Sequence, residues 1–258
     1  MPIPIKTIKS ISQYLTEIED LSKDNPKLWF RGHESIDHKL NPSIYRIPFE
    51  SKFEEEFQVK FKSRAIPFLR ESLSNNDYWS WLFLMQHHGV PTRLLDWSSS
   101  ALVALAFAVL YRGNNYADRD AVIWCLNPIK LNSEDRVRII LKDNELIPDI
   151  SVVKKVESVY KFKPDSSSDY PIAITGPLNN DRIVAQKGTF TLFPDKVAFN
   201  LEDRDEADQF LTKFIIPKND VESIKKQLLI LGISETSVYP ELASLGHEIK
   251  REFIETIK

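Results

Sequence analysis

Two short polar segments carry many of the side chains in this chain that could do chemistry. Arg31 follows two large aromatic residues and precedes a glycine in the sequence WFRG. Further along, the segment 86–97 reads QHHGVPTRLLDW and combines histidines, an arginine, an aspartate and a tryptophan around Gly89 and Pro91. Core packing does not demand that mixture, so the two segments predict a ligand-binding or catalytic site.

The guanidinium group of Arg31 is suited to binding a phosphate or a carboxylate. It offers a planar fork of N–H donors that can form two parallel hydrogen bonds with either group. We expect Arg31 to emerge at the end of a buried strand, where Gly32 leaves room for a ligand to approach closely. A structural ion pair with Glu34 or Asp96 is the alternative.

His87 and His88 are candidates for proton transfer. A histidine at the carboxyl end of a helix is favoured in its protonated form, which suits general acid catalysis or contact with a phosphate. Adjacent residues lie about 100° apart on a helix, which is poor geometry for joint chelation, and we expect no metal. Alternatively, one histidine is a core residue and the other is solvated.

The rest of segment 86–97 supplies candidate binding residues. An arginine and an aspartate across a turn are commonly a loop staple, which is one interpretation of Arg93 and Asp96. The accumulation of polar side chains favours instead a polar site walled by Trp81 and Trp97. The candidates here are Gln86, Thr92, Arg93, Asp96 and Trp97.

A third segment lies late in the chain, from Asp181 to Phe190. We predict a strand over 182–193, in which Arg182 and Gln186 share a face and line one groove. Gly188 would let the backbone bulge or admit a ligand. Arg31, one of the two histidines, Arg93 and Gln186 are therefore expected to converge on one concave site.

Hydrophobic periodicity predicts the elements that position these side chains. Helices are expected at 6–23, at 50–73 with a kink at Pro67, at 77–88, at 101–111 as a fully buried helix, at 219–232 and from Pro240 onward. Strands are expected at 28–31, 121–126, 171–175, 182–193 and 211–217, and an exposed loop at about 161–170. The acidic runs at 54–57 and 201–209 are expected to be solvated helix faces.

This order of elements predicts one α+β domain over residues 1–258, with a mixed or antiparallel sheet flanked by helices. Residues 1–115 are expected to be rich in helix, 116–218 rich in strand, and 219–258 helical.

Composition excludes several functional classes. A formal charge of -3 provides no global basic field that would draw the chain to nucleic acid. The 7 glycines are too dispersed for a Rossmann or P-loop nucleotide motif. Cys125, the one cysteine, sits in the apolar run AVIWCL and is expected to be a buried core thiol. The chain shows no signal-peptide pattern, and its longest apolar run, 101–111, is well short of the ~20 residues that cross a bilayer. We therefore expect a cytoplasmic protein without membrane contact.

The combination of WFRG, QHHGVPTRLLDW and a following apolar helix resembles the FRG domain, a bacterial family named for its Phe-Arg-Gly motif. The resemblance continues through Asn41–Arg46, Asp181–Phe190 and Tyr239–Leu242, hence nearly the whole chain. The layout also resembles ADP-ribosyltransferase-type NAD-binding folds. That resemblance implies that Arg31 contacts NAD and that Gln186 occupies the late catalytic position, although no glutamate lies beside Gln186.

Two classes of function follow from these observations. The first is an NAD-using, ADP-ribosyltransferase-like enzyme, acting as a toxin or anti-phage defence effector on a nucleic-acid or protein acceptor. Its catalytic residues would be Gln186, His87 and His88, and its binding residues Arg31, Gly32, Gln86, Thr92, Arg93, Asp96, Trp97 and Arg182. The alternative is a non-enzymatic module that binds a nucleotide or nucleic-acid phosphate through Arg31, His87, Arg93 and Arg182. A purely structural scaffold would leave the polar clustering unexplained.

Overall fold

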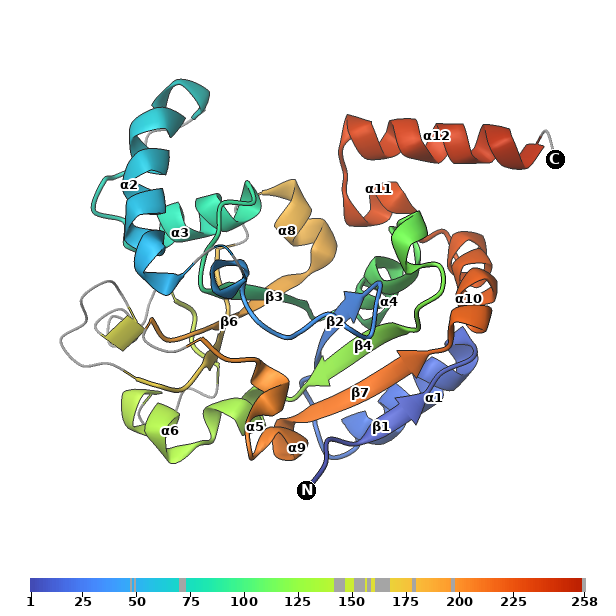
Figure 1. Cartoon of the computed structure of the whole chain (residues 1–258), viewed down its shortest axis with the longest axis horizontal. Helices are drawn as coiled ribbons and strands as arrows, with labels where there is room; N and C mark the ends of the chain where they lie inside the picture. Colours follow the sequence, from blue (N-terminus) through green and yellow to red (C-terminus); the bar gives the residue numbers. More distant parts are fainter. Residues whose placement is uncertain are drawn as a thin grey trace.

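A seven-stranded sheet forms the centre of the chain, in the order β1-β7-β4-β2-β3-β6-β5 (Figure 1). The computed structural model describes residues 1–258 except 47, 49, 70–72, 142–146, 151–155, 157–158, 161–167, 178–179, 196–197 and 257–258. The strands are β1 (Ile5–Thr7), β2 (Trp29–His33), β3 (Leu94–Ser98), β4 (Ala121–Leu126), β5 (Ile172–Ile174), β6 (Gly188–Leu192) and β7 (Leu211–Ile216). Neighbours are antiparallel except β1 and β7, which are parallel. The predicted α+β class with a mixed sheet is confirmed.

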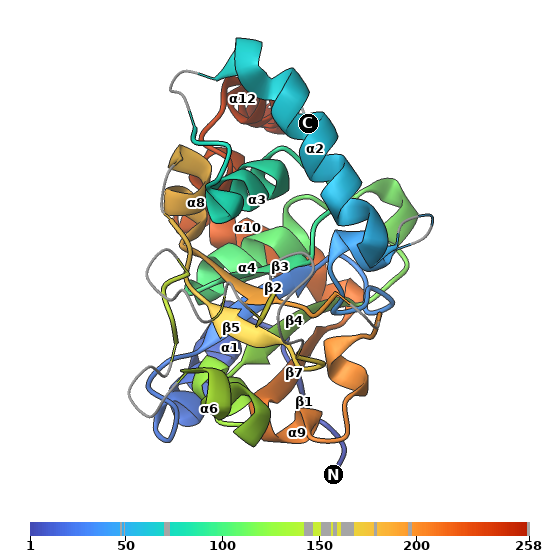
Figure 2. The same cartoon turned by 90° about the vertical axis from the view of Figure 1, so that its left-hand side faces the viewer.

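Helices cover the sheet on both sides. α1, α4 and α10 contribute to the core cluster on one face, and α3, α6, α8 and α9 to the cluster on the other. In the side view, α2, α3, α8 and α12 lie towards the top of the molecule and α6 and α9 towards the bottom (Figure 2). The helices are α1 (Ile11–Ser22), α2 (Glu54–Ala65), α3 (Tyr78–His87), α4 (Ala101–Val109), α5 (Pro128–Asn132), α6 (Asp135–Leu141), α8 (Asp181–Gln186), α9 (Ala207–Phe210), α10 (Lys218–Ile230), α11 (Glu235–Val238) and α12 (Leu242–Thr256). The loop expected at 161–170 lies largely outside the described residues.

β4 lies between β2 and β7, and every one of its residues is buried. Side chains of a strand point alternately to opposite faces. Ala121, Ile123 and Cys125 therefore join the core cluster that contains residues of α1, α4 and α10. The alternate residues Val122, Trp124 and Leu126 join the cluster on the other face of the sheet. The prediction that Cys125 is a buried core thiol is confirmed.

The predicted helix is confirmed as α4, which ends two residues earlier than expected, at Val109. It is largely but not fully buried, because Ala101, Leu102 and Phe107 are partly exposed. Ala104, Leu105 and Ala106 are fully buried. α4 packs directly on β2, because a Cβ atom added at Gly32 would lie 1.8 Å from the carbonyl oxygen of Ala104. Gly32 is therefore needed for close packing of helix on strand, a role that the sequence analysis did not anticipate.

Two segments near the expected site differ from the prediction. Leu94–Ser98 is a strand, whereas a short connection between helices was expected there. Asp181–Gln186 is a helix and not a strand, because the Asn180 side chain caps it by accepting a hydrogen bond from the Ile183 N–H. Lys187 then adopts a left-handed conformation with φ of 48°, which ends α8 immediately before β6.

Candidate functional site

A pocket of about 200 Å³ opens where β2, β3 and β6 meet the helices α3 and α8. We call it the central pocket. It is lined by Phe30, Arg31, Gly32, Phe83, Gln86, His87, Asp96, Trp97, Ser98, Phe107, Arg182, Ile183, Gln186, Gly188, Phe190 and Tyr239. The lining residues come from both predicted polar segments and from the late segment that begins at Asp181. Eight predicted site residues thus line one pocket: Arg31, Gly32, Gln86, His87, Asp96, Trp97, Arg182 and Gln186.

Arg31 projects from β2 and is held by two neutral acceptors. Its Nε donates to His33 Nε2 at 2.8 Å, and its Nη1 donates to the backbone oxygen of Asp96 at 2.6 Å. Burial lowers the pKa of Arg31 to about 10, with Asp96 opposing the shift, so the guanidinium remains protonated near neutral pH. Within the described residues Arg31 makes no ion pair, and the predicted structural alternatives with Glu34 or Asp96 are not formed.

Arg182 and Gln186 lie on α8, which forms one side of the central pocket. They are four residues apart on α8, so they share one face, as expected, although the element is a helix. The Arg182 guanidinium lies over the Tyr239 ring, 4.3 Å from its centroid, and donates to its hydroxyl at 3.2 Å. Gln186 Nε2 donates to the backbone oxygen of Val238 at 3.2 Å, which fixes the amide against α11.

Asp96 is the only carboxylate among the residues lining the central pocket. It lies on β3, with its side chain exposed. Gln86 donates to Asp96 Oδ2 at 2.8 Å, while its own Oε1 accepts a hydrogen bond from the Thr92 hydroxyl. Gln86 therefore orients the carboxylate and connects it to the buried residues behind the pocket.

The two histidines are separated by the geometry of the end of α3. His87 lines the pocket, whereas His88 lies at the C-cap with its ring 6.3 Å from that of Phe61 on α2. Burial lowers the pKa of His87, and the charges of His88 and Arg182 add to this effect against Glu241. The lowered pKa favours the neutral imidazole, which can accept a proton or a hydrogen bond, whereas the helix carboxyl end alone was expected to favour the protonated form.

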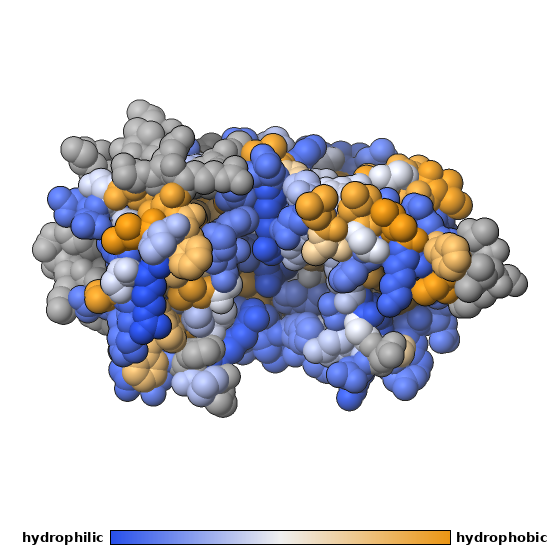
Figure 3. Space-filling view, turned by 90° about the horizontal axis from the view of Figure 1, so that it is seen from above, coloured by the Kyte–Doolittle hydropathy of each residue, from blue (hydrophilic) through white to orange (hydrophobic). Residues whose placement is uncertain are grey.

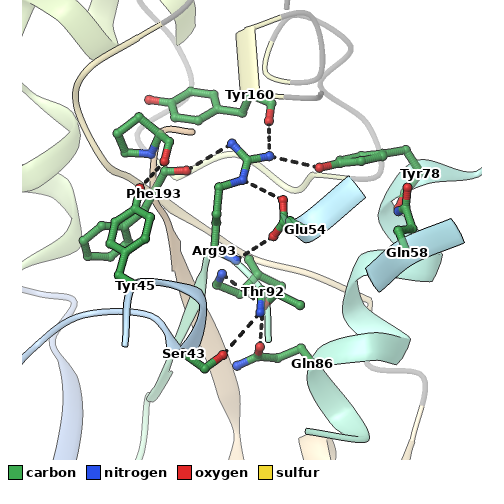
Figure 4. Close-up of polar contacts among 12 residues, drawn as sticks. Ser43, Tyr45, Glu54, Gln58, Tyr78, Gln86, Thr92, Arg93, Tyr160 and Phe193 are labelled. Atoms are coloured by element: carbon green, nitrogen blue, oxygen red, sulfur yellow. Dashed lines mark hydrogen bonds and ion pairs between the residues drawn. The ribbon is translucent and has the colours of Figure 1, made fainter. Parts of the chain in front are cut away.

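Arg93 lies outside the pocket, fully buried behind β3 (Figure 4). Its Nε donates to Glu54 Oε2 at 2.6 Å, and its other nitrogens donate to the Tyr78 hydroxyl and to the backbone oxygens of Tyr160 and Phe193. Burial acts to lower the pKa of Arg93, but the charge of Glu54 and its hydrogen bond outweigh this and raise it. Arg93 therefore does not join the predicted concave site.

Three further residues also differ from expectation, because each makes contacts within the fold and none lines the central pocket. Glu54, expected on a solvated helix face, is fully buried against Arg93. Thr92 is also fully buried and bonds to Ser43, Gln86 and Leu94. Trp81 does not wall the pocket, because its Nε1 donates to the Ser74 backbone oxygen at 2.9 Å and its ring meets Phe61.

Aromatic rings that the sequence did not single out form much of the pocket wall. Phe83 and Phe190 meet edge to face with centroids 4.9 Å apart. Tyr239 stacks under Arg182 and lies 5.7 Å from Phe107. For Tyr239, the resemblance of the segment that begins there to the FRG domain was the one sequence signal. The phenylalanines are spread over β2, α3, α4 and β6, and no sequence pattern indicated that they would meet.

Seen from above, the molecule is hollowed between the side that carries α2 and the side that carries α12 (Figure 3). Hydrophilic residues, in blue, line much of this hollow, and hydrophobic residues gather on both flanks. Among the described residues, no group of three or more histidine, cysteine, aspartate or glutamate side chains is placed to hold a metal ion. No described helix has the length and apolar character needed to cross a bilayer.

The chain is therefore an α+β protein with a mixed sheet and a polar pocket between strands and helices. Residues 26–117, 92 of the 258, match the model of the FRG domain family. The match includes β2, α2, α3, β3 and α4, but it does not reach α8 or Tyr239, where the resemblance was expected to continue. Neither the curated proteins nor the solved structures gave a match to the chain.

Proposed function

We propose that the central pocket binds a nucleotide, with NAD as the first ligand to test. The observation that supports this most is that Arg31 and Arg182 both line the pocket without an ion pair to any described residue. A buried cation is stable when something compensates its charge. A phosphate held in two parallel hydrogen bonds would supply that charge to either guanidinium.

The size of the pocket limits how much of such a ligand it encloses. A volume of about 200 Å³ is below the ~300–1,000 Å³ that is usual for pockets of drug-sized ligands. A ring and its ribose would therefore occupy the pocket while the remainder of a dinucleotide extends beyond it. Phe30, Trp97, Phe107 and Phe190 supply aromatic surface for the ring.

An enzymatic activity on this ligand would use Asp96 and His87. NAD supplies a ribosyl group with nicotinamide as the leaving group, and positive charge develops on the ribose as that bond breaks. Asp96 is held by Gln86 and carries the negative charge that would stabilise such a state. His87, neutral at pH 7, would accept a proton from an attacking hydroxyl. Gln186 cannot titrate, so we assign it the placement of the ligand against α11, in revision of the catalytic role expected for it.

Titration calorimetry with NAD and an assay for nicotinamide release test this proposal together. Arg31→Ala should weaken NAD binding by ~10- to 150-fold, the loss of a charge-assisted hydrogen bond of about 1.5–3 kcal/mol. Arg31→Lys should restore part of the affinity, since it keeps the charge but loses the fork. Arg64→Ala, an exposed arginine of α2, is the matched control.

The two activity variants separate binding from turnover. Asp96→Asn should keep NAD affinity within a few-fold and abolish nicotinamide release, because a group that acts in the transition state contributes little to ground-state binding. Gln186→Ala should lower affinity and turnover together. Full turnover in Asp96→Asn would remove the enzymatic role proposed for this carboxylate.

A second candidate is a non-enzymatic module that binds a nucleotide or nucleic-acid phosphate. The same uncompensated arginines favour it, now without Arg93, which is buried. No heat with NAD, together with Arg31-dependent binding of an RNA or DNA oligonucleotide, would favour this candidate over the enzyme.

A toxin or defence role would rest on the enzymatic activity. Expression of the wild-type chain should then slow growth of a bacterial host, and Asp96→Asn should relieve the effect at equal protein level. Equal growth of both strains would count against this role.

A further inference from the structure

We propose that a second, basic pocket on the other side of Arg31 binds the diphosphate group of a nucleotide whose ring and ribose occupy the central pocket. This inference rests on the nucleotide proposed above and names where its phosphates lie. The basic pocket has a volume of about 410 Å³ and is lined by Arg31, His33, Asp37, His38, Lys39, Asn41 and Arg46. Arg31 lines both pockets and so stands at the boundary between them.

The basic pocket carries an excess of positive charge in a chain that is negative overall. Arg31, Lys39 and Arg46 contribute three cations, and Asp37 contributes one carboxylate. Asp37 lies 3.5 Å from Arg119, and Lys39 lies 3.9 Å from Glu202, so each has a weak partner outside the pocket. Arg31 and Arg46 have no such partner among the described residues. The resulting field favours a ligand with more than one negative charge.

Arg46 is held in place with one end of its guanidinium left open. Its Nε donates to Asn41 Oδ1 at 3.2 Å and its Nη2 donates to the Asn41 backbone oxygen at 2.9 Å. Its Nη1 makes no hydrogen bond within the described residues. Partial burial of its guanidinium lowers the pKa of Arg46, with Asp96 opposing the shift, so the group is partly desolvated and fixed by neutral acceptors although the residue as a whole is exposed. An arginine in that state is prepared for an anion from outside.

His33 adds a buried donor without a partner. It is 7% exposed and lines the basic pocket. Because an arginine Nε can only donate, His33 Nε2 must be the unprotonated acceptor, and the ring proton therefore lies on Nδ1. Nδ1 is buried and makes no hydrogen bond of normal geometry in the described part of the chain, although the backbone of His38 is near enough to affect the pKa of the ring. A buried N–H without an acceptor costs free energy, and it is one further donor beside the cations.

The test uses inorganic pyrophosphate as the probe, which binds the basic pocket without requiring the central one. Titration calorimetry on the full chain should detect pyrophosphate binding. Arg46→Ala should weaken it by ~10-fold or more, as expected for a charge-assisted hydrogen bond, and Lys39→Ala by less because Lys39 is exposed and near Glu202. Arg64→Ala removes the same charge from an exposed site outside both pockets and should leave binding unchanged.

Either of two results would overturn the inference. One is no binding of pyrophosphate to the wild-type chain at millimolar concentration. The other is an equal loss in Arg46→Ala and Arg64→Ala, which would reduce the effect to net charge. Both variants are at exposed positions, and thermal unfolding checks that they remain folded.

Comparison of ADP with adenosine distinguishes this inference from the function proposed above. If both hold, ADP binds more tightly than adenosine and the difference disappears in Arg46→Ala. Nucleotide binding that is insensitive to Arg46→Ala would refute the basic pocket and leave the central pocket intact. Pyrophosphate binding that depends on Arg46, with no nucleotide bound, would refute the nucleotide proposal and retain an anion site.

Discussion

Arg93 is fully buried and Arg31 is partly buried, and the surroundings of their guanidinium groups differ. Around Arg93, one carboxylate, one phenol and two carbonyl oxygens accept hydrogen bonds inside a closed cluster. Around Arg31, an imidazole nitrogen and one carbonyl accept, and no carboxylate of the described residues forms an ion pair. The environment raises the pKa of Arg93 and lowers that of Arg31. An arginine such as Arg93, whose hydrogen bonds and charge are all matched within the fold, connects structural elements. An arginine such as Arg31, whose charge no ion pair balances, is available to an anionic ligand.

The largest effect is expected from breaking the saturated cluster. Arg93→Ala leaves Glu54 as a buried carboxylate without its ion pair, which should lower the free energy of unfolding by about 3–5 kcal/mol. Urea unfolding measures this, and the double variant Arg93→Met, Glu54→Leu should recover much of the loss. A stable, fully folded Arg93→Ala protein would show that the cluster does not hold α2 to β3.

Gly32→Ala is expected to have the next largest effect, because it acts on the strand that carries Arg31. The new Cβ would lie 1.8 Å from a backbone oxygen of α4, so strand and helix must separate. Overpacking of this kind costs ~1–3 kcal/mol and occasionally more. Gly113→Ala, which meets nothing within 4 Å, is the matched control in the same thermal unfolding experiment.

The neutral acceptor beside Arg31 predicts a pH dependence. Burial lowers the pKa of His33 well below its usual value, and the positive charges of Arg31, His38 and Arg46 add to this, while the backbone of His38 opposes it. A lowered folded-state pKa stabilises the fold above the unfolded pKa of about 6.5, and this contribution is lost as pH falls below it. His33→Gln keeps an acceptor that does not titrate. Its unfolding free energy should fall less between pH 7 and 5, by up to about 1.4 kcal/mol per pH unit.

The smallest effect on stability is expected from Arg31→Met. Two hydrogen bonds are lost, but an uncompensated buried charge is removed as well, so the free energy of unfolding should change by no more than about 1 kcal/mol. Urea unfolding of Arg31→Met beside Arg93→Ala compares the two arginines directly. Equal losses in the two variants would make Arg31 a structural residue and contradict its proposed role.

The site was predictable where side chains follow the ends of strongly patterned elements. The apolar periodicity predicted α3, which ends at His87, and α4. α3 places Gln86 and His87 at the central pocket that Arg31 also lines. The strand β3 was missed because Asp96, together with Pro91 before it and the serines that follow Trp97, resembled a turn. The caps of α8 were present in the sequence as Asn180 and Lys187, but β-branched residues between them favoured a strand.

The partners of Arg93 could not be predicted. Glu54 lies 39 residues away in sequence, on a helix whose acidic first turn looks solvated. Which of several glutamates enters the core depends on how α2 meets β3, and that is decided by packing over the whole domain. The sequence alone does not distinguish an arginine whose partners lie within the fold, such as Arg93, from an arginine that lines a pocket, such as Arg31.

The position of β2 and β3 in the sheet has a consequence for protein synthesis. They share one residue pair, Phe30 with Ser98, while five pairs join β2 to β4 and five join β3 to β6. Both main partners lie after residue 117, beyond the segment that matches the FRG domain. During synthesis, the β2 and β3 segments therefore leave the ribosome before β4 and β6, and their edges lack most of their hydrogen-bonding partners until β4 and β6 have been made. Unpaired edges are templates for association with other chains, so this segment isolated as a fragment should aggregate.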